Sequence, residues 1–218
     1  MCGRFLTPDE SDFERCWQLA PPEGYRRSFN VAPTQLAAII RRRRDGSREA
    51  ALFVWGFRPQ WANRHWINAR AETVFTSPAF KRAAAVQRCL VPAAGWYEWQ
   101  GETQPKTPYV HYRGDFEPIA FAGIWTGTGR AGEPGSTRSF AILTRPAAPS
   151  VAFVHDRMPA VLDPAGYSAW LDPATPTPDL EALLGAPVGD FASRRISTYV
   201  NKPAHDDPAC IAPADDAG

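Results

Sequence analysis

Residues 35–57, QLAAIIRRRRDGSREAALFVWGF, decide the fold. Two strand-like runs, residues 35–42 and 49–57, flank the dipeptide Asp45-Gly46, a strong short-range signal for a β-hairpin. Five further strand-like runs follow along the chain, at residues 88–99, 107–113, 118–126, 137–145 and 194–198. These runs occur in neighbouring series and do not alternate one by one with helices. The sequence therefore predicts an α+β fold whose mostly antiparallel sheet is curled toward a barrel.

Short helices are predicted where a proline follows a capping residue, because Ser, Thr and Asp side chains accept the first free N–H groups and proline fits the first turn. Four dipeptides fit this pattern: Thr7-Pro8, Ser77-Pro78, Asp163-Pro164 and Thr177-Pro178. No repeat or low-complexity linker divides the chain. We therefore expect a single domain over residues 1–211, with a disordered tail over residues 212–218.

The composition is typical of a soluble globular protein, with 44% hydrophobic and 22% charged residues among 218. No apolar run approaches the ~18 residues of a membrane span. The N-terminus lacks the apolar core of a signal peptide, so a cytoplasmic protein is predicted, nucleoid-associated if bacterial. The four cysteines form no C-x-x-C pair and the four histidines are scattered, so no metal site and no cofactor are predicted.

Charge is unevenly distributed along this nearly neutral chain. Residues 1–90 carry 15 Lys and Arg against 8 Asp and Glu, whereas the remainder carries 9 against 15. A basic half suggests an anionic partner, of which nucleic acid is the commonest. The run Arg41–Arg44, taken alone, is more simply a solvated hairpin end, and its role stays open.

Cys2 follows the initiator methionine in MCGRF. Removal of Met1 would leave a 1,2-aminothiol, whose thiol and α-amine have ordinary pKa values of roughly 8.5 and 7.7–8.0. An aldehyde can form an imine with this amine and then be captured by the sulfur as a five-membered thiazolidine. The alternative is that Cys2 is an ordinary small buried thiol.

Two further stretches carry candidate polar groups. In WINARAETV, Asn68, Arg70 and Glu72 share one face at the period of a strand. The alternative is an ordinary solvent-exposed face. In GWYEW, Glu98 lies among aromatic residues, and desolvation there would raise its pKa toward that of a general acid or base. The alternative is an exposed strand residue beside core tryptophans.

Three other motifs contribute candidates. His155 in VHDRMPAVL follows an apolar segment and could shuttle protons near neutral pH, although a lone histidine is more often structural. Asn30 and Pro33 in FNVAPTQ indicate a rigid loop. In WGFRPQWA, Arg58 and Trp61 suit phosphate pairing and base stacking, whereas Trp61 alone would be interpreted as core.

These motifs occur in one order from residue 1 to about residue 211, together with VNKPAHDDPACI. The chain resembles the SOS-response-associated peptidase (SRAP) family over nearly its whole length. The resemblance implies a DNA-damage protein that crosslinks itself to abasic sites in single-stranded DNA, including junctions with duplex, and we expect a monomer. It implies that Cys2 supplies the thiazolidine atoms, Asn68 positions them, Glu98 assists proton transfer, and His155 acts on ring opening and on reversal.

The candidate DNA-binding residues are Gly3, Arg4, Asn30, Pro33, Arg58, Trp61 and Arg70. Three alternatives stay open. The first is an N-terminal-nucleophile amidohydrolase, since glutamine amidotransferases also begin Met-Cys-Gly, although there small apolar residues follow. The second is a cysteine peptidase that uses Cys2, His155 and Glu98 to cleave an amide, such as that of its own leader. As an enzyme, the protein is accordingly expected to be a peptidase or other hydrolase, or a lyase. The third is a non-catalytic module that binds single-stranded DNA.

Overall fold

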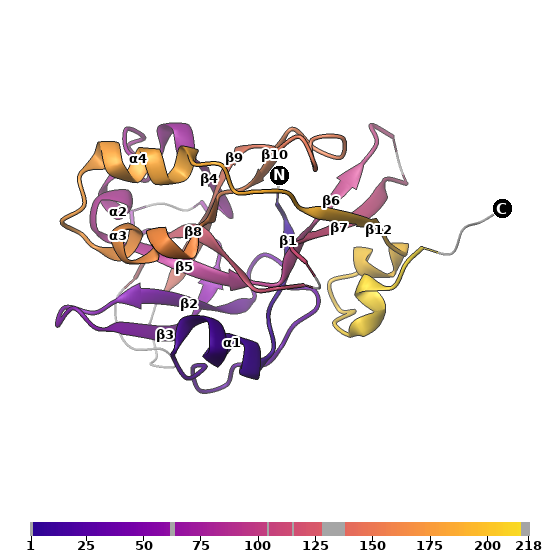
Figure 1. The fold of residues 1–218 in the computed structure, drawn as a ribbon, viewed down its shortest axis with the longest axis horizontal. Helices are drawn as coiled ribbons and strands as arrows, with labels where there is room; N and C mark the ends of the chain where they lie inside the picture. Colours follow the sequence, from indigo (N-terminus) through magenta and orange to yellow (C-terminus); the bar gives the residue numbers. More distant parts are fainter. Residues whose placement is uncertain (1, 62–63, 104, 115, 128–137, 215–218) are drawn as a thin grey trace.

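The computed structural model describes residues 2–61, 64–103, 105–114, 116–127 and 138–214. Two sheets, both rich in antiparallel pairs, organise the chain (Figure 1). The smaller sheet has the strand order β1-β6-β7-β12 and is antiparallel throughout. Its strands are β1 (Arg4–Leu6), β6 (Gly95–Gln100), β7 (Thr107–Tyr112) and β12 (Ala192–Arg195).

The larger sheet has eight strands and closes partly on itself. They are β2 (Leu36–Arg42), β3 (Arg48–Trp55), β4 (Asn68–Arg70), β5 (Arg88–Ala93), β8 (Ile119–Thr126), β9 (Ser139–Pro146), β10 (Arg157–Pro159) and β11 (Val161–Leu162). Strand β9 pairs with both β3 and β8, so β9-β3-β2-β5-β8 forms a ring. Among the strands of the described residues, only the pairs that β9 makes with β3 and β4 are parallel. The predicted α+β fold with a curled, mostly antiparallel sheet is confirmed.

The β2–β3 hairpin forms where the sequence predicts it. The amide of Arg43 donates to the carbonyl of Ser47 at 2.7 Å, and Gly46 has φ +88°, a conformation that favours glycine. The single strand-like run over residues 88–99, by contrast, divides into β5 and β6, which belong to different sheets. The division falls before Gly95, where a Cβ atom would lie 2.5 Å from the carbonyl oxygen of His111.

In the part of the chain that the structure describes, four α-helices flank the sheets: α1 (Glu10–Trp17), α2 (Lys81–Val86), α3 (Tyr167–Leu171) and α4 (Thr177–Gly185). The first begins later than predicted, with Asp9 as its cap, because the hydroxyl of Thr7 instead accepts from the amide of Ser28 at 2.7 Å. The helix predicted at Ser77 begins only at Lys81. Asp163 caps as predicted, accepting from the amide of Ala165.

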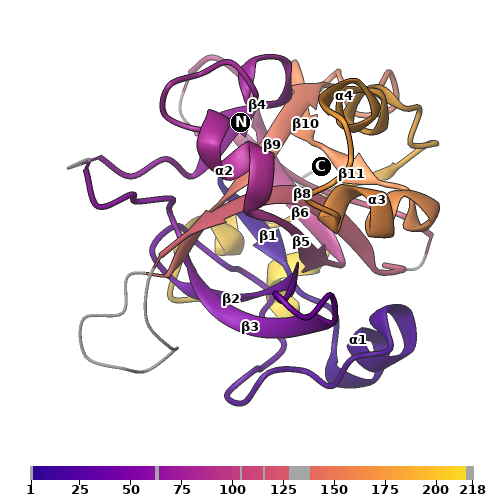
Figure 2. The same ribbon diagram turned by 90° about the vertical axis from the view of Figure 1, so that its left-hand side faces the viewer.

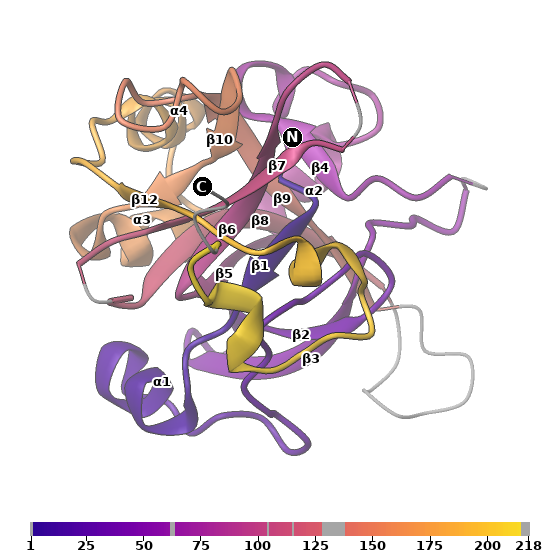
Figure 3. The ribbon, with the colours of Figure 1, turned by 90° about the vertical axis from the view of Figure 1, so that its right-hand side faces the viewer.

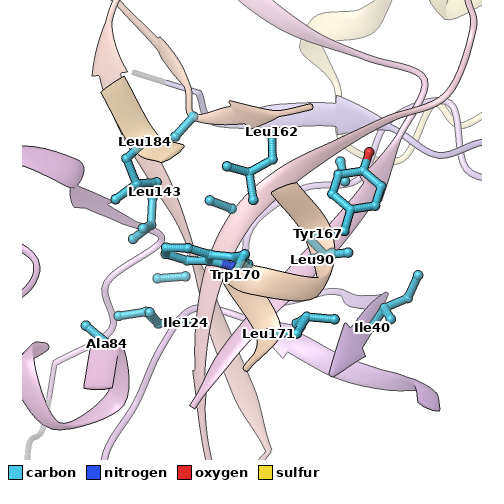
Figure 4. Packing of buried hydrophobic residues seen from close by; sticks show 14 of the residues in the cluster. Ile40, Ala84, Leu90, Ile124, Leu143, Leu162, Tyr167, Trp170, Leu171 and Leu184 are labelled. Atoms are coloured by element: carbon cyan, nitrogen blue, oxygen red, sulfur yellow. The ribbon is translucent and has the colours of Figure 1, made fainter. Parts of the chain in front are cut away.

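Two hydrophobic clusters hold the ring in place. Outside it, Trp170 of α3 packs among leucines of the sheet and of α4, and its indole N–H donates to the carbonyl of Cys89 at 2.9 Å (Figure 4). Inside it, inward side chains of β2, β3, β5, β8 and β9 pack with Cys2, Phe5 and Trp96. The N-terminal segment therefore closes one end of the ring, where the two sheets meet.

The C-terminal segment packs against the small sheet as two 3₁₀ helices, Thr198–Asn201 and Pro208–Ile211 (Figure 3). Of the predicted tail 212–218, residues 215–218 lie outside the described residues. Pro213 pairs with Ile196, and the boundary of the domain at residue 211 stays a prediction. Among the described residues, no helix has the length and apolar character needed to cross a membrane.

Candidate functional site at the N-terminal cysteine

Cys2 lies at the meeting point of the two sheets. It lies two residues before β1, which pairs with β6, is fully buried, and donates its S–H to the carbonyl of Arg4 at 3.7 Å. The side-chain amide of Asn68, at the start of β4, donates to the carbonyl oxygen of Cys2 at 2.8 Å. This bond ties the N-terminus to the large sheet, as the small sheet holds it through β1. The position of Cys2 is therefore fixed from both sides.

Glu98 is the carboxylate nearest to this point in the pairing. Arg4 of β1 pairs with Tyr97 of β6. Extending this antiparallel register by one residue places Gly3 opposite Glu98. Glu98 is only 3% exposed, and burial raises its pKa to about 7. Burial first, and then the carboxylate of Glu98, raise the pKa of the Cys2 thiol well above its ordinary value. The thiol of Cys2 therefore senses the charge of Glu98, and Glu98 exchanges a proton near neutral pH.

His155 lies in the segment that leads into β10. Its Nδ1 accepts from the backbone amide of Arg157 at 3.0 Å and lies 2.8 Å from the carboxylate of Asp156. One neutral nitrogen cannot accept and donate at once, so the two contacts belong to different protonation states of the ring. Burial lowers the pKa of His155, which favours the neutral ring. Asp156 and Lys106 act on the pKa of both His155 and Glu98, which places these two groups in one electrostatic environment.

Asn68 and Arg70 share one side of β4, as predicted from the strand period. Arg70 is exposed, whereas the Oδ1 atom of Asn68 is buried and has no hydrogen-bond partner among the described residues. The prediction that Glu72 continues this face is wrong. The strand ends at Arg70, and Glu72 falls in the 3₁₀ turn that follows. Its carboxylate instead accepts from the guanidinium of Arg157.

Arg157 is a residue of this site that sequence reasoning missed. Its backbone amide holds His155, and its guanidinium donates to Glu72 and to the carbonyl of Thr144 at 2.6 Å. It thereby joins the turn after β4 to the histidine segment. The available signal was its place in VHDRMPAVL, which was interpreted only for its histidine. Lys106, which acts on the pKa of both Glu98 and His155, gave no signal in the sequence.

Asn30 is buried and Arg4 is half-buried, and both side chains form hydrogen bonds within the protein. The guanidinium of Arg4 donates to Oδ1 of Asn30 at 2.9 Å and to the carbonyls of Val200 and Asn201. Asn30 is 1% exposed, and its amide donates to three backbone carbonyls within residues 200–205. These polar groups fasten the C-terminal segment to β1. These bonds support the position of Cys2. Because the polar atoms of Arg4 and Asn30 are used in them, these two residues are not among the phosphate contacts that we propose.

The remaining candidates for DNA contact lie nearer the surface. Arg58 is exposed, and Gly3 and Pro33 are half-buried. Trp61 is 67% exposed, with its ring centroid 6.1 Å from that of Trp66. The interpretation of Trp61 as a core residue is therefore wrong.

The fold and the site define a single-domain α+β protein whose N-terminal cysteine lies beside an amide and a carboxylate, with an imidazole in the same electrostatic environment. The chain belongs to the SRAP family, since the model of the SOS response associated peptidase (SRAP) matches residues 1–203. The family resemblance of its ordered motifs is thus confirmed.

Its relatives include proteins from bacteria and vertebrates. The abasic site processing protein YoqW of Bacillus subtilis is 33% identical over 97% of this chain and 99% of its own length. The abasic site processing protein YedK of Escherichia coli is 33% identical over 78% of this chain and 79% of its own. A solved structure of a phage-related protein from Bordetella bronchiseptica is 32% identical, covers 89% of this chain and 94% of its own, and has a TM-score of 0.73.

Proposed function

We propose that this protein processes abasic sites in single-stranded DNA by crosslinking itself to them through Cys2 after removal of Met1. The observation that carries the proposal is the placement of Cys2, whose carbonyl is held by Asn68 and whose thiol senses the charge of Glu98. The names of the relatives, which are abasic site processing proteins, support the same substrate. An abasic site is a masked aldehyde, which is the group that an N-terminal cysteine captures.

The reaction needs only the atoms of Cys2 and the sugar. The α-amine adds to C1 of the ring-opened deoxyribose, and loss of one water gives the imine. The thiol sulfur then forms a bond to the same carbon, while the S–H proton passes to the nitrogen. The product is a thiazolidine, and the overall change is the loss of one water molecule with no oxidant or reductant.

Glu98 and Asn68 serve the amine and the linkage. Because burial brings the pKa of Glu98 to about 7, near neutral pH it is present both as a carboxylate that accepts the amine proton and as an acid that returns it to the departing water. Asn68 fixes the carbonyl of Cys2, which keeps the amine and thiol in one orientation. Its buried, unpartnered Oδ1 is available to the amine or to the sugar.

His155 serves the sugar. Its Nδ1 has a donor on one side, the amide of Arg157, and an acceptor on the other, the carboxylate of Asp156. The neutral ring can therefore carry its proton on either nitrogen, and Nε2 can donate or accept. Opening of the deoxyribose moves a proton from the C1 hydroxyl to the ring oxygen, which is a task for such a shuttle.

The charges around Cys2 favour this reaction over amide hydrolysis. A cysteine hydrolase needs a thiolate, which a neighbouring cation or helix N-terminus supplies by lowering the thiol pKa. Here burial and the carboxylate of Glu98 raise the pKa of Cys2. A neutral thiol leaves the first attack to the amine and closes the ring afterwards. Peptidase activity on the chain's own leader has no comparable support.

The test is a denaturing gel. Protein that lacks Met1 is incubated with a single-stranded oligonucleotide that contains one abasic site, and with the same oligonucleotide intact. We expect a heat- and detergent-resistant shifted band with the abasic strand alone. If no such band forms, or if the intact strand gives the same band, the proposal fails.

Substitution of His155 by alanine is expected to slow release from a preformed adduct as well as its formation. Each positioned proton-transfer group contributes roughly 10²–10⁴-fold. One group acting on the same sugar oxygen serves both directions. The measurement is a chase, in which excess unlabelled abasic DNA is added to the preformed adduct and the exchange of label is followed over hours. Unchanged exchange in a folded variant with normal DNA affinity would return His155 to a purely structural role.

A further inference from the structure

We propose that the concave surface between the tip of the β2–β3 hairpin and α2 is a second DNA-binding site, which holds single-stranded DNA flanking the abasic site. The identity of the strand rests on the function proposed above. The cavity has a volume of about 1270 Å³ and is lined by the hairpin tip, the loop of Arg58–Trp61, α2 and the end of α3. Figure 2 faces this side of the molecule, with the hairpin below and α2 above. None of Cys2, Asn68, Glu98 and His155 lines it.

The charge of this groove is the first argument. Eight of its lining side chains are cationic and three are anionic, in a chain whose net charge is only +1. Arg44, Arg58, Lys81 and Arg82 are exposed, and within the described part of the chain they form no ion pair. Cations without internal partners are suited to neutralising phosphates, with release of the condensed counterions.

The other arginines of the hairpin give the groove its shape. Arg42 pairs with Asp172, at the end of α3, at 2.6 Å, which bridges the two sides of the groove. Arg41 pairs with Glu49 and lies over the ring of Trp125, 4.6 Å from its centroid. Arg43 also pairs with Glu49, at 2.8 Å, so the run Arg41–Arg44 combines three arginines held in ion pairs with one, Arg44, that is open to a ligand. A groove whose side chains are already held in place loses less conformational entropy when it binds a ligand, which favours binding.

Its size and its aromatic groups identify the ligand as an unpaired strand. The volume exceeds the roughly 300–1,000 Å³ typical of small-molecule pockets, which are also mostly apolar. Trp61 is 67% exposed and presents ring surface to the groove, whereas Trp125 lines the groove with the guanidinium of Arg41 over its ring. Unpaired bases stack on such rings, whereas the bases of a duplex are already stacked.

A short segment of the chain, from Phe57 to Asn68, links the groove to the Cys2 site. Backbone hydrogen bonds between Phe57 and Trp66 close the loop that carries Arg58 and Trp61. Asn68, which holds the carbonyl of Cys2, follows two residues after Trp66. One segment of the chain therefore contributes residues to both places.

The experiment compares two double variants that remove the same charge from exposed positions. Arg44→Ala with Arg82→Ala removes two groove cations, whereas Arg26→Ala with Arg195→Ala removes two exposed cations that lie outside the groove. Binding to intact single strands of about 6 and about 30 nucleotides is measured by fluorescence anisotropy across a salt series. For the long strand, we expect the groove variant to lower the log–log salt slope by about 1.4, at about 0.7 per lost contact. The control variant keeps the wild-type slope.

Several outcomes would overturn the groove. These are a groove variant with the wild-type slope on the long strand, or an equal loss of slope in the control variant. The intact strands keep this test separate from the covalent chemistry. The crosslinking gel with a short abasic strand at saturating protein is run in parallel, and wild type and groove variant should give the same yield. A lost slope with a normal yield supports the groove, whereas absence of adduct in all proteins contradicts the proposed function and leaves the groove result standing.

Discussion

Substitution of Cys2 by alanine is expected to abolish the stable adduct with abasic single-stranded DNA. Alanine keeps the α-amine, so an imine can still form, but without sulfur no ring closes and water returns the aldehyde. Cys2→Ser should leave at most a weak imine that borohydride reduction traps. The measurement is the denaturing gel, with and without the reductant, on proteins whose loss of Met1 has been verified by mass spectrometry.

Two controls separate the aminothiol from general thiol reactivity. Cys16 is the least buried of the four free thiols, yet it has no adjacent amine, so Cys16→Ala should crosslink like the wild type. A chain with extra residues before Cys2 keeps the thiol and loses the amine, and it should bind DNA without forming thiazolidine. Full crosslinking by Cys2→Ala, or the same adduct on the extended chain, would rule out the mechanism.

The sequence predicted the parts of the fold that depend on local chemistry. The β2–β3 hairpin follows from Asp45-Gly46, which favours the turn that the strands need. The break between β5 and β6 was not predictable, because residues 88–95 are buried without interruption and the sequence offers no polar residue at the division. Its cause is tertiary: only glycine at position 95 fits against the carbonyl of His111.

The same distinction applies to the site. The aromatic setting of Glu98 was visible in GWYEW, and the structure buries that carboxylate as the pattern indicated. Arg4 and Asn30 were predicted as DNA-binding residues, and the sequence did not reveal their bonds to the carbonyl of Val200, which lies 196 and 170 residues away along the chain. Arg157 was missed for a similar reason, since its partner Glu72 is 85 residues distant. Long-range hydrogen bonds decide whether an arginine is a DNA contact or an internal brace, and a single sequence does not contain them.

The placement of Glu98 carries a cost in stability. Its pKa is raised by burial, so the folded protein holds a proton that the unfolded chain releases at lower pH. The stability that this proton contributes is fully present below the ordinary glutamate pKa and is lost as pH rises through about 7. The folded protein is therefore less stable at the pH values at which Glu98 is ionised and would act as a base.

Substitution of Glu98 by glutamine is accordingly expected to have opposite effects on rate and on stability. Glutamine has nearly the same shape but exchanges no proton, so crosslinking should slow by roughly 10²–10⁴-fold, with some product at long times because Cys2 keeps its atoms. The wild-type rate should rise with pH through about 7 as Glu98 ionises, and the variant should lack this rise and keep only that of the amine, near about 8.

Thermal unfolding provides the companion measurement. At about pH 8 the variant should unfold at a higher temperature than the wild type, because it buries no charge, and near pH 4 the two should agree, because Glu98 is then neutral in both states. Glu72→Gln is the matched control, since Glu72 is half-exposed and its pKa is lowered by Arg157, so this variant should gain no stability at high pH. A variant that is slower and yet more stable cannot owe its slowness to unfolding. If Glu98→Gln crosslinks at the wild-type rate, or if it loses rate and stability together at about pH 8, the carboxylate is a structural group and the proton transfer must be assigned elsewhere.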